Sequence, residues 1–374
     1  MTAPADLLSQ LRRAPDVEAP ELVAVDATDR LLLDEAAELL RLCGPGEVAV
    51  VDDAYGALTL GSVALHGARD VRVAQDLLVG ERALARNAER TGLAGTYRSL
   101  PLGPDLAAGA KVVLVRAPKA LEALREIAEV LAASSDSEVT VLVGARVKHM
   151  THAMNDVLRD SFTDVSATLA RQKSRLLIAR GPEPSPSSFP RRQEHPDLGL
   201  VVCAHGAAFA GTKIDIGTRT LLGALEPAAP AETALDLGCG TGVLATALAR
   251  GRPGLQVIAV DQSAAAVASA RATAEANGLS ERIRVVRDDA ADSVPDGSVD
   301  LVVCNPPFHV GAAVATTAAD RLFVAAGRVL RSGGELWTVY NSALRYKPTL
   351  SRLVGPTRVV ARNPKFTVTV STRR

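Results

Sequence analysis

The sequence has few cysteines, and their spacing excludes two kinds of protein. Its 374 residues include four cysteines with no C-x-x-C pair, namely Cys43, Cys203, Cys239 and Cys304. Isolated cysteines argue against a disulfide framework and against a structural zinc site. Cys239 and Cys304 lie in candidate site loops, but no histidine-rich spacing supports a nucleophile or a metal ligand there. We expect small, buried thiols and no metal ion.

The sequence also lacks long apolar runs. No run approaches the length of a membrane span, and the N-terminus Met-Thr-Ala-Pro-Ala-Asp lacks the basic and apolar segments of a signal peptide. We therefore expect a cytoplasmic monomer with no membrane partner. With 47% hydrophobic and 22% charged residues, the composition suits helices packed on parallel strands, and the length favours two domains.

A net charge is missing as well, but the charges are unevenly distributed. Residues 321–374 hold eleven of the 42 basic residues and one of the 42 acidic ones, which leaves 31 and 41 for the rest. This basic C-terminal segment indicates an anionic partner, although a solvated basic surface would look the same. The aromatics after residue 307 could stack on bases beside phosphates: Phe308, Phe323, Trp337, Tyr340, Tyr346 and Phe366.

Short apolar strands alternate with helical stretches along the first half. We expect strands at 47–52, 71–74, 111–115 and 138–143, and helices at 29–42, 77–90 and 120–133. This alternation predicts an α/β fold with a doubly wound, mostly parallel sheet. A proline-rich stretch without periodicity at 182–198 reads as a linker, so we expect domains at 1–181 and 199–374.

The second half repeats landmarks of the first at nearly the same spacing. Residues 50–58 parallel 234–244, 71–76 parallel 257–261, and 90–93 parallel 276–279. Arg116-Ala117-Pro118-Lys119 falls where the second half has Asn305-Pro306-Pro307-Phe308. We interpret the N-terminal half as a degenerate copy, without catalysis, that has lost its glycines and its Asn-Pro-Pro.

A glycine-rich loop follows an apolar strand in the second half. In Asp236-x-Gly238-x-Gly240-x-Gly242, the glycines let the backbone turn tightly and lie against a bulky ligand. The dinucleotide fingerprint would place another glycine where this chain has Val243.

Acidic residues follow the next two strands. Asp261 ends an apolar strand and is placed to accept hydrogen bonds from ribose hydroxyls. Asp288 and Asp289 end the strand 283–287, and we assign Asp289 to an adenine amine, with a simple turn acid as the alternative. These features alone fit a nicotinamide cofactor and S-adenosylmethionine equally well.

The Asn305-Pro306-Pro307-Phe308 loop separates these two ligands. It stops the buried strand 301–304, because two prolines remove two backbone donors and fix two φ angles. A planar exocyclic amine is a poor nucleophile, so its site must accept its hydrogens and hold its lone pair in line with an electrophilic methyl group. Asn305 and the Pro306 carbonyl offer acceptors, and Phe308 offers a ring on which a base can stack.

These motifs resemble those of the class I S-adenosylmethionine-dependent methyltransferases. The motifs are Asp-Leu-Gly-Cys-Gly-Thr-Gly at 236–242 and Asn-Pro-Pro-Phe-His at 305–309. More narrowly, the chain is similar to the two-domain ribosomal RNA guanine-N2 methyltransferases (RsmC/RlmG-like). Further stretches carry this resemblance, namely Asp-Ile-Gly-Thr-Arg at 215–219, residues 332–337 and residues 341–346.

The resemblance implies two tandem Rossmann-like methyltransferase domains, an S-adenosyl-L-methionine site in the second, and RNA recognition by the first. The substrate would be ribosomal RNA or a ribosomal subunit. By position, the cofactor would contact Asp236, Gly238, Gly240, Gly242, Asp261 and Asp289. The target guanine would contact Asn305, Pro306 and Phe308 as catalytic residues, with Thr218, Arg219, Pro307 and His309 bordering the substrate. A general-base role for His309 is not needed, because methyl transfer requires no prior proton removal.

Three other functions stay open at this point. A glutamine-N5 or adenine-N6 methyltransferase would use the same Asn-Pro-Pro-aromatic loop. An RNA-binding or ribosome-assembly module could keep the fold without turnover, although the intact glycines argue against it. A nicotinamide dehydrogenase fits least, because of Val243 and the absence of a candidate hydride-transfer acid.

Overall fold

The computed structural model describes residues 4–19, 21–226, 228–307 and 312–374. The chain forms two compact units, Met1–Phe189 and Pro190–Arg374, and each is described by itself. Strand β8 (Arg191–His195) lies within the stretch 182–198 that was expected to be a linker.

The first unit is built on a seven-stranded sheet with the order β3-β2-β1-β4-β5-β7-β6. Its strands are β1 (Val48–Val51), β2 (Val71–Ala74), β3 (Tyr97–Ser99), β4 (Val112–Arg116), β5 (Thr140–Arg146), β6 (Phe162–Ala167) and β7 (Ser174–Pro182). Its helices are α1 (Pro4–Gln10), α2 (Ala27–Glu35), α3 (Ala37–Leu42), α4 (Ala57–His66), α5 (Leu78–Thr91), α6 (Pro104–Ala107), α7 (Leu121–Ser134), the 3-10 helix η1 (Val147–His149) and α8 (His152–Arg159).

The second unit has a seven-stranded sheet with the order β12-β11-β10-β13-β14-β16-β15, and a two-stranded sheet of β8 and β9 (Leu200–Ala204). The strands of the large sheet are β10 (Thr233–Leu237), β11 (Gln256–Asp261), β12 (Ile283–Arg287), β13 (Val299–Cys304), β14 (Leu330–Asn341), β15 (Thr357–Arg362) and β16 (Phe366–Thr372). The helices are α9 (Ile216–Ala224), α10 (Val243–Gly251), α11 (Ala264–Ala276), α12 (Ala312–Val329), the 3-10 helix η2 (Ser342–Leu344) and α13 (Lys347–Leu353).

The two sheets have the same topology. In each, the first five strands in sequence run parallel, and the last two add an antiparallel edge. The strand order reverses between the first and fourth strands, which are β1 and β4 in one unit and β10 and β13 in the other. The prediction of two tandem α/β domains with doubly wound, mostly parallel sheets is therefore confirmed.

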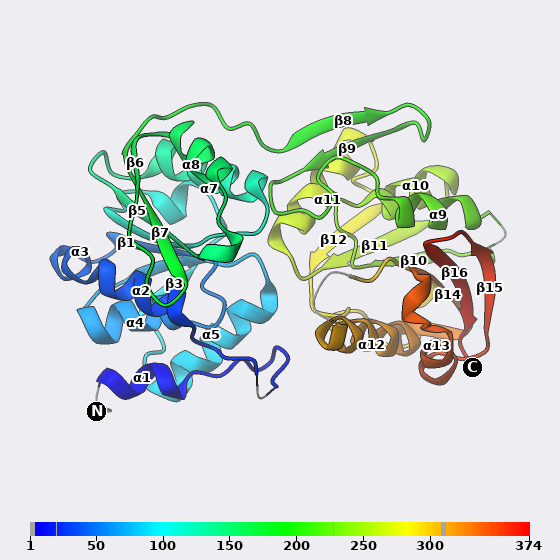
Figure 1. The fold of residues 1–374 in the computed structure, drawn as a ribbon. Coiled ribbons are helices and arrows are strands. Elements are labelled where there is room, and N and C mark those ends of the chain that lie inside the picture. Colours follow the sequence, from blue (N-terminus) through cyan, green and yellow to red (C-terminus); the bar gives the residue numbers. More distant parts are fainter. Residues whose placement is uncertain (1–3, 20, 227, 308–311) are drawn as a thin grey trace. The chain divides into compact units, whose positions relative to one another are not determined.

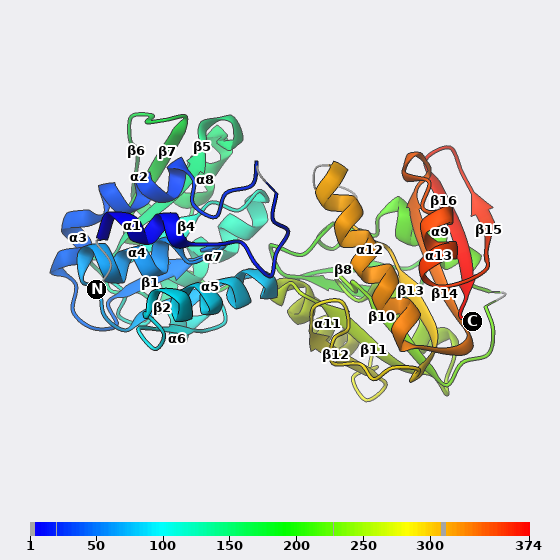
Figure 2. The same ribbon diagram turned by 90° about the horizontal axis from the view of Figure 1, so that it is seen from below.

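Helices cover both faces of each sheet, as the apolar strands require. In the second unit, α9, α10 and α11 pack on one face through Leu221, Leu244 and Ala270. Helices α12 and α13 pack on the other face through Phe323 and Leu350 (Figures 1 and 2). Both faces of the sheet are thus buried. Polar groups can therefore gather at the edge where the strands end.

Strand β9 lies beside helix α11 (Figure 1). Its backbone hydrogen-bonds to polar side chains on and directly after that helix. The backbone N–H groups of residues 201, 203 and 205 donate to Asn277 Oδ1, Thr273 Oγ1 and Ser269 Oγ at 3.1, 3.0 and 2.9 Å. The match is geometric, because two strand residues span about 6.6 Å and four helical residues about 6 Å. This pairing gives hydrogen-bond partners to the backbone N–H groups along the free edge of the β8–β9 hairpin.

Two expectations from the sequence were wrong in detail. The stretch 29–42 is not a single helix, because Ala36 separates α2 from α3 with φ −86° and ψ −5°. The aromatics expected to stack on bases are core residues, since Phe323, Trp337, Tyr340, Tyr346 and Phe366 are all at most 6% exposed. These aromatics are buried because removing their apolar surface from water is favourable, whatever the charge of the residues around them. Phe308 lies outside the described residues.

Within the described part of the chain, no helix has both the length and the apolar character needed to cross a bilayer.

Candidate active site

The glycine loop and the described part of the Asn-Pro-Pro segment, Asn305–Pro307, lie at the edge of the second sheet where its strands end. Leu237, the last residue of β10, pairs with Cys304, the last residue of β13. The glycine loop that follows β10 and the Asn-Pro-Pro loop that follows β13 therefore start side by side. This is the point where the strand order reverses, and ligands of open α/β sheets bind at such a crevice.

The glycine loop has a conformation that favours glycine. Gly238, Gly240 and Gly242 have φ angles of +77°, +52° and +76°. A Cβ at Gly238 or Gly240 would meet no atom within 4 Å, so the loop presents a bare backbone to open space. A Cβ at Gly242 would lie 3.0 Å from Ala270, so this third glycine allows α10 to approach α11. The first two glycines leave room for a ligand, and the third serves packing.

Two aspartates brace this loop. Asp261 Oδ2 accepts a hydrogen bond from the Gly240 N–H at 3.0 Å, and its Oδ1 accepts one from the Ser263 N–H at 2.9 Å. Asp236 is fully buried and its Oδ2 accepts from the Ala245 N–H at 2.9 Å, which caps the first turn of α10. Burial raises the pKa of Asp236 to about 7, with a further contribution from the charge of Asp261.

Asn305 has its amide held from one side. Its Nδ2 donates to Thr218 Oγ1 at 3.0 Å and lies 3.3 and 3.4 Å from the two carboxylate oxygens of Asp215. Its Oδ1 is shielded from solvent and has no hydrogen-bond partner among the described residues. A buried acceptor without a partner is costly, and in a site it is available to a donor on the ligand.

The rest of the Asn-Pro-Pro-Phe-His segment is only partly described. Pro306 is buried and Pro307 is exposed, directly after Asn305. The positions predicted for base stacking and for bordering the substrate, Phe308 and His309, lie outside the described residues. Their roles stay predictions.

The remaining predicted residues have partners within the unit. Asp289 is 6% exposed and its carboxylate forms an ion pair with Arg321 of α12, while Asp288 accepts from the N–H and hydroxyl of Ser293. Arg219 pairs with Asp197 on the surface. Thr218 contacts Asn305 directly, so the structure brings Thr218 to the strand-end site while Arg219 forms its ion pair with Asp197.

The cysteines of the two loops are buried thiols. Cys239 and Cys304 are 7% and 0% exposed, and burial raises the pKa of each thiol. A protonated, enclosed thiol is a poor nucleophile. Among the described residues, no group of three or more histidine, cysteine or acidic side chains is arranged to hold a metal ion.

Asp215 is the site residue that was not assigned a role from the sequence. It caps α9, because its Oδ1 accepts from the N–H groups of Gly217 and Thr218 at 2.8 and 3.2 Å. Asp followed by a helical pattern is an N-cap signal that the sequence does contain. The contact with Asn305, 90 residues away, has no such local signal.

The first unit contains the matching positions with different side chains. Val51 pairs with Val115 as Leu237 pairs with Cys304, so Arg116 stands where the second unit has Asn305. Arg116 donates at 2.7 Å to both Asp26 and Asp29, at the start of α2. Although burial raises the pKa of Asp26, its hydrogen bond and attraction to Arg116 lower that pKa to about 2.

The glycine positions of the first unit are also changed. Counted from the paired strand ends, Asp52 and Ala54 replace Gly238 and Gly240, while Gly56 keeps the place of Gly242 with φ +93°. One glycine is therefore retained, which corrects the expectation that all were lost. It is the packing glycine, since a Cβ there would lie 2.7 Å from Leu84 of α5.

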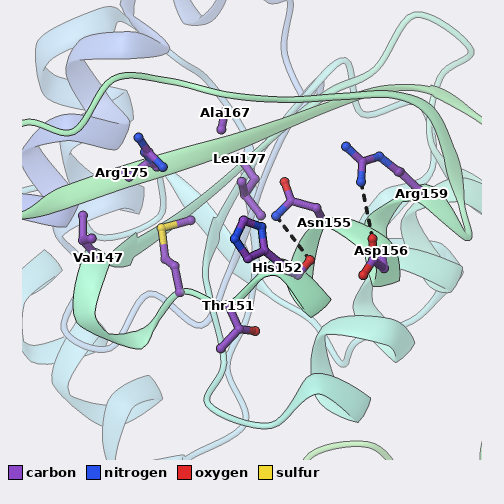
Figure 3. A pocket seen from close by; sticks show the side chains of 10 residues that line it. Val147, Thr151, His152, Asn155, Asp156, Arg159, Ala167, Arg175 and Leu177 are labelled. Atoms are coloured by element: carbon purple, nitrogen blue, oxygen red, sulfur yellow. Dashed lines mark hydrogen bonds and ion pairs between the residues drawn. The ribbon is translucent and has the colours of Figure 1, made fainter.

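A pocket of the first unit lies apart from these strand-end positions. It is formed by η1, α8, β6 and β7, and Figure 3 shows the side chains that line it. Met150 and Leu177 give it apolar surface, Arg159 and Arg175 give it cationic groups, and His152 adds an imidazole ring. It contains none of the residues predicted for catalysis.

The strand order, the bare glycine loop and the Asn-Pro-Pro loop together define a class I methyltransferase. The comparisons agree with this class. The model of the "Methyltransferase small domain" matches residues 199–370, and that of the "RLMG N-terminal domain" matches residues 3–183. The chain is also similar to a solved structure, the 16S rRNA N2 methyltransferase RsmC of T. thermophilus in complex with AdoMet and guanosine. The TM-score is 0.72 at 23% identity, with 93% of this chain and 92% of that chain covered.

Curated relatives narrow the class to a family. The chain is 38% identical over 362 residues to the ribosomal RNA large subunit methyltransferase G of Pseudomonas aeruginosa, covering 96% of both chains. It is 38% identical over 371 residues to the protein of that name in Streptomyces coelicolor, again covering 96% of both. The chain belongs to the ribosomal RNA large subunit methyltransferase G family, and it is a methyltransferase.

Proposed function

We propose that the protein transfers a methyl group from S-adenosyl-L-methionine to the exocyclic N2 amine of a guanine in large-subunit ribosomal RNA. The Oδ1 of Asn305, which has no partner among the described residues, carries this proposal, because it is a fixed acceptor beside the glycine loop. The name of the family's relatives supports the large subunit as the substrate.

The cofactor site fits this chain's residues. Gly238 and Gly240 offer backbone with open space above it, and Asp261 is the last residue of the neighbouring strand β11. When bound there, S-adenosylmethionine would supply an electrophilic methyl group on a sulfonium ion. The carboxylate of Asp289, just beyond the end of β12, would accept a hydrogen bond from the adenine amine. One of its oxygens already accepts a hydrogen bond from Arg321.

Asn305 would do the central positioning work. Its Oδ1 would accept one hydrogen of the amine, which turns the nitrogen lone pair toward the methyl group. The Pro306 carbonyl would accept the other hydrogen, and Phe308 would stack on the guanine. After transfer, the extra proton on nitrogen can leave to water, so no residue has to remove it in advance.

The first unit would contribute to RNA recognition without catalysis. Arg116 has both ends of its guanidinium directed at Asp26 and Asp29, and it presents no acceptor to an amine. The Asp52 and Ala54 positions add side chains where the second unit has bare backbone. We also propose that the enzyme acts in the cytoplasm as a monomer without a metal ion, which suits a ribosomal substrate.

Methylation with labelled cofactor tests the proposal. Purified large-subunit and small-subunit ribosomal RNA, each as naked RNA and as assembled subunits, would be incubated with the enzyme and digested to nucleosides. We expect label in N2-methylguanosine from the large-subunit RNA. Label in N6-methyladenosine, label only in protein glutamine, or no transfer to any form of RNA would contradict the proposal.

A further inference from the structure

We propose that Asp215 is a positioning residue that fixes the orientation of the Asn305 amide, so that its oxygen and not its nitrogen faces the target amine. The inference rests on the proposed function and adds a residue to it. Asp215 does not reach the substrate in this scheme. It acts only through Asn305 and Thr218.

The argument begins with the partners of the Asn305 Nδ2. Both carboxylate oxygens of Asp215 can only accept hydrogen bonds, and they lie 3.3 and 3.4 Å away. The Thr218 hydroxyl donates its single proton to Asp215 Oδ2, so toward Asn305 it can only accept. Every group on that side of the amide is therefore an acceptor. The amide satisfies them only with its NH2 group, which leaves Oδ1 on the other side.

The cap of α9 holds Asp215 itself in place. Its Oδ1 accepts the N–H groups of Gly217 and Thr218, so the carboxylate cannot swing away without uncapping the helix. A Cβ at Gly217 would lie 2.9 Å from Asp215 Oδ1 and 3.5 Å from Asn305 Nδ2. Glycine at this position is what lets the helix start lie so close to the Asn-Pro-Pro loop.

The first unit repeats the arrangement and shows what asparagine adds. There, Asp26 caps α2 through the N–H groups of Thr28 and Asp29, and Arg116 donates to it from the end of β4. In both units, the N-cap aspartate before the first strand holds the residue at the end of the fourth strand. A guanidinium has donors on every side, whereas an amide held by its nitrogen presents an acceptor. Both units thus share the contact with the N-cap aspartate. Of Arg116 and Asn305, only Asn305 also presents an acceptor, and this acceptor has no partner among the described residues.

The substitution Asp215→Asn tests the orientation. Asparagine caps helices as well as aspartate does, so α9 should stay capped through its side-chain oxygen. Its NH2 group would then stand where Oδ2 stood and face the NH2 group of Asn305. Two donors repel, and the network is satisfied only when Asn305 turns by 180° and presents NH2 to the substrate. We expect kcat to fall roughly 10- to 100-fold, as for a lost hydrogen bond to the reacting group.

The dissociation constant for S-adenosylmethionine, the melting temperature and kcat together distinguish a positioning role of Asp215 from a purely structural one. The dissociation constant for S-adenosylmethionine, measured by calorimetry, should stay within a few-fold for Asp215→Asn, and the melting temperature should change little. Asp215→Ala removes the cap as well, so it should lower both kcat and the melting temperature. The matched control is Asp26→Asn, which makes the same change in the first unit and should leave kcat unaltered.

A kcat for Asp215→Asn equal to that of the wild type would overturn the inference, since a residue that only caps α9 tolerates this change. An equal loss of kcat in Asp26→Asn would also overturn it. Absence of N2-guanine methylation by the wild-type enzyme is a different result. That outcome would reject the proposed function, and the variant assays would then not be needed.

Discussion

At the scale of single residues, one position decides what each half of the chain can do. At the end of the fourth strand, the first unit has Arg116 and the second has Asn305 at the matching position. Both donate to an N-cap aspartate, but Arg116 uses its charge to neutralise two partly buried carboxylates. Asn305 brings no charge and leaves an acceptor free.

This contrast predicts opposite effects of two alanine substitutions. Asn305→Ala should abolish methyl transfer while leaving S-adenosylmethionine affinity within a few-fold and the melting temperature almost unchanged. Arg116→Ala should leave kcat intact and lower the free energy of unfolding by about 1–3 kcal/mol, because it leaves the charge of Asp26 and the carboxyl group of Asp29, whose pKa burial raises to about 7, without their partner. Activity assays, calorimetry and urea unfolding of the two variants measure this. Equal loss of activity in both would contradict the assignment of catalysis to one unit.

Asp236 predicts a pH dependence of stability. Its pKa is about 7 when folded against an ordinary 3.8, because burial disfavours the charged form. The protonated side chain is the stable one, so its contribution is complete below pH 4 and is lost as the pH rises through 7. Asp236→Asn keeps the acceptor for Ala245 and removes the titration. Between pH 5 and pH 8, the free energy of unfolding of the wild type should therefore fall relative to that of the variant by about 2.7 kcal/mol.

Urea unfolding of both proteins at the two pH values measures this difference. The same gain for Asp236→Asn at pH 5 and at pH 8 would show that Asp236 does not titrate in this range.

At the scale of elements, the first turn of α9 is the least tolerant part of the site. A Cβ at Gly217 would clash with Asp215 Oδ1 at 2.9 Å and lie tightly against Phe366 at 3.3 Å, and it would make an ordinary contact with Asn305 at 3.5 Å. A Cβ at Gly223, near the other end of the same helix, would meet nothing within 4 Å. The two glycines thus have different reasons to be there, although both lie in one helix.

Gly217→Ala and Gly223→Ala form a matched pair. Gly223→Ala should raise the free energy of unfolding by about 0.5–1 kcal/mol, because alanine favours the helix. Gly217→Ala should lower it by about 1–3 kcal/mol through overpacking, and it should reduce kcat by displacing Asn305. Thermal unfolding and single-turnover methylation measure both effects. A stabilised and fully active Gly217→Ala variant would show that this contact is loose.

At the scale of the whole molecule, the basic C-terminal segment, residues 321–374, remains a candidate for contact with RNA. The structure pairs three of its eleven cations, Arg321, Arg328 and Arg331, with acids of the second unit. Seven of the others are exposed, namely Arg345, Lys347, Arg352, Arg358, Arg362, Lys365 and Arg374. Charges at Arg358 and Arg362 also protect the edge strand β15 from pairing with other chains, so they have a structural use as well.

Salt titrations of RNA binding separate these uses. If Arg362 and Lys365 contact phosphates, Arg362→Ala with Lys365→Ala should weaken binding and reduce the slope of log K against log salt by about 1.4–1.8. The control is Arg331→Ala, which removes a cation already engaged by Asp300 and should change the slope little. An unchanged slope in the double variant would assign these charges to solubility and edge protection.

The sequence by itself determined the fold class and most of the loop chemistry. Strand and helix periods, the glycine spacing and the two prolines are local properties, so the sheets, the bare loop and the end of β13 were predicted from neighbouring residues. The same local patterns wrongly predicted that the aromatics of the basic segment 321–374 stack on bases, because burial depends on which elements pack over a strand. They also gave no sign of the partners of Arg116.

Only the tertiary structure decided how Asn305 is oriented. Asp215 and Asn305 are 90 residues apart in sequence, and they meet because α9 starts at the strand ends of the sheet. An isolated asparagine offers a donor and an acceptor equally. The acceptor-only groups of Asp215 and Thr218 remove that choice, and this is a property of the folded chain alone.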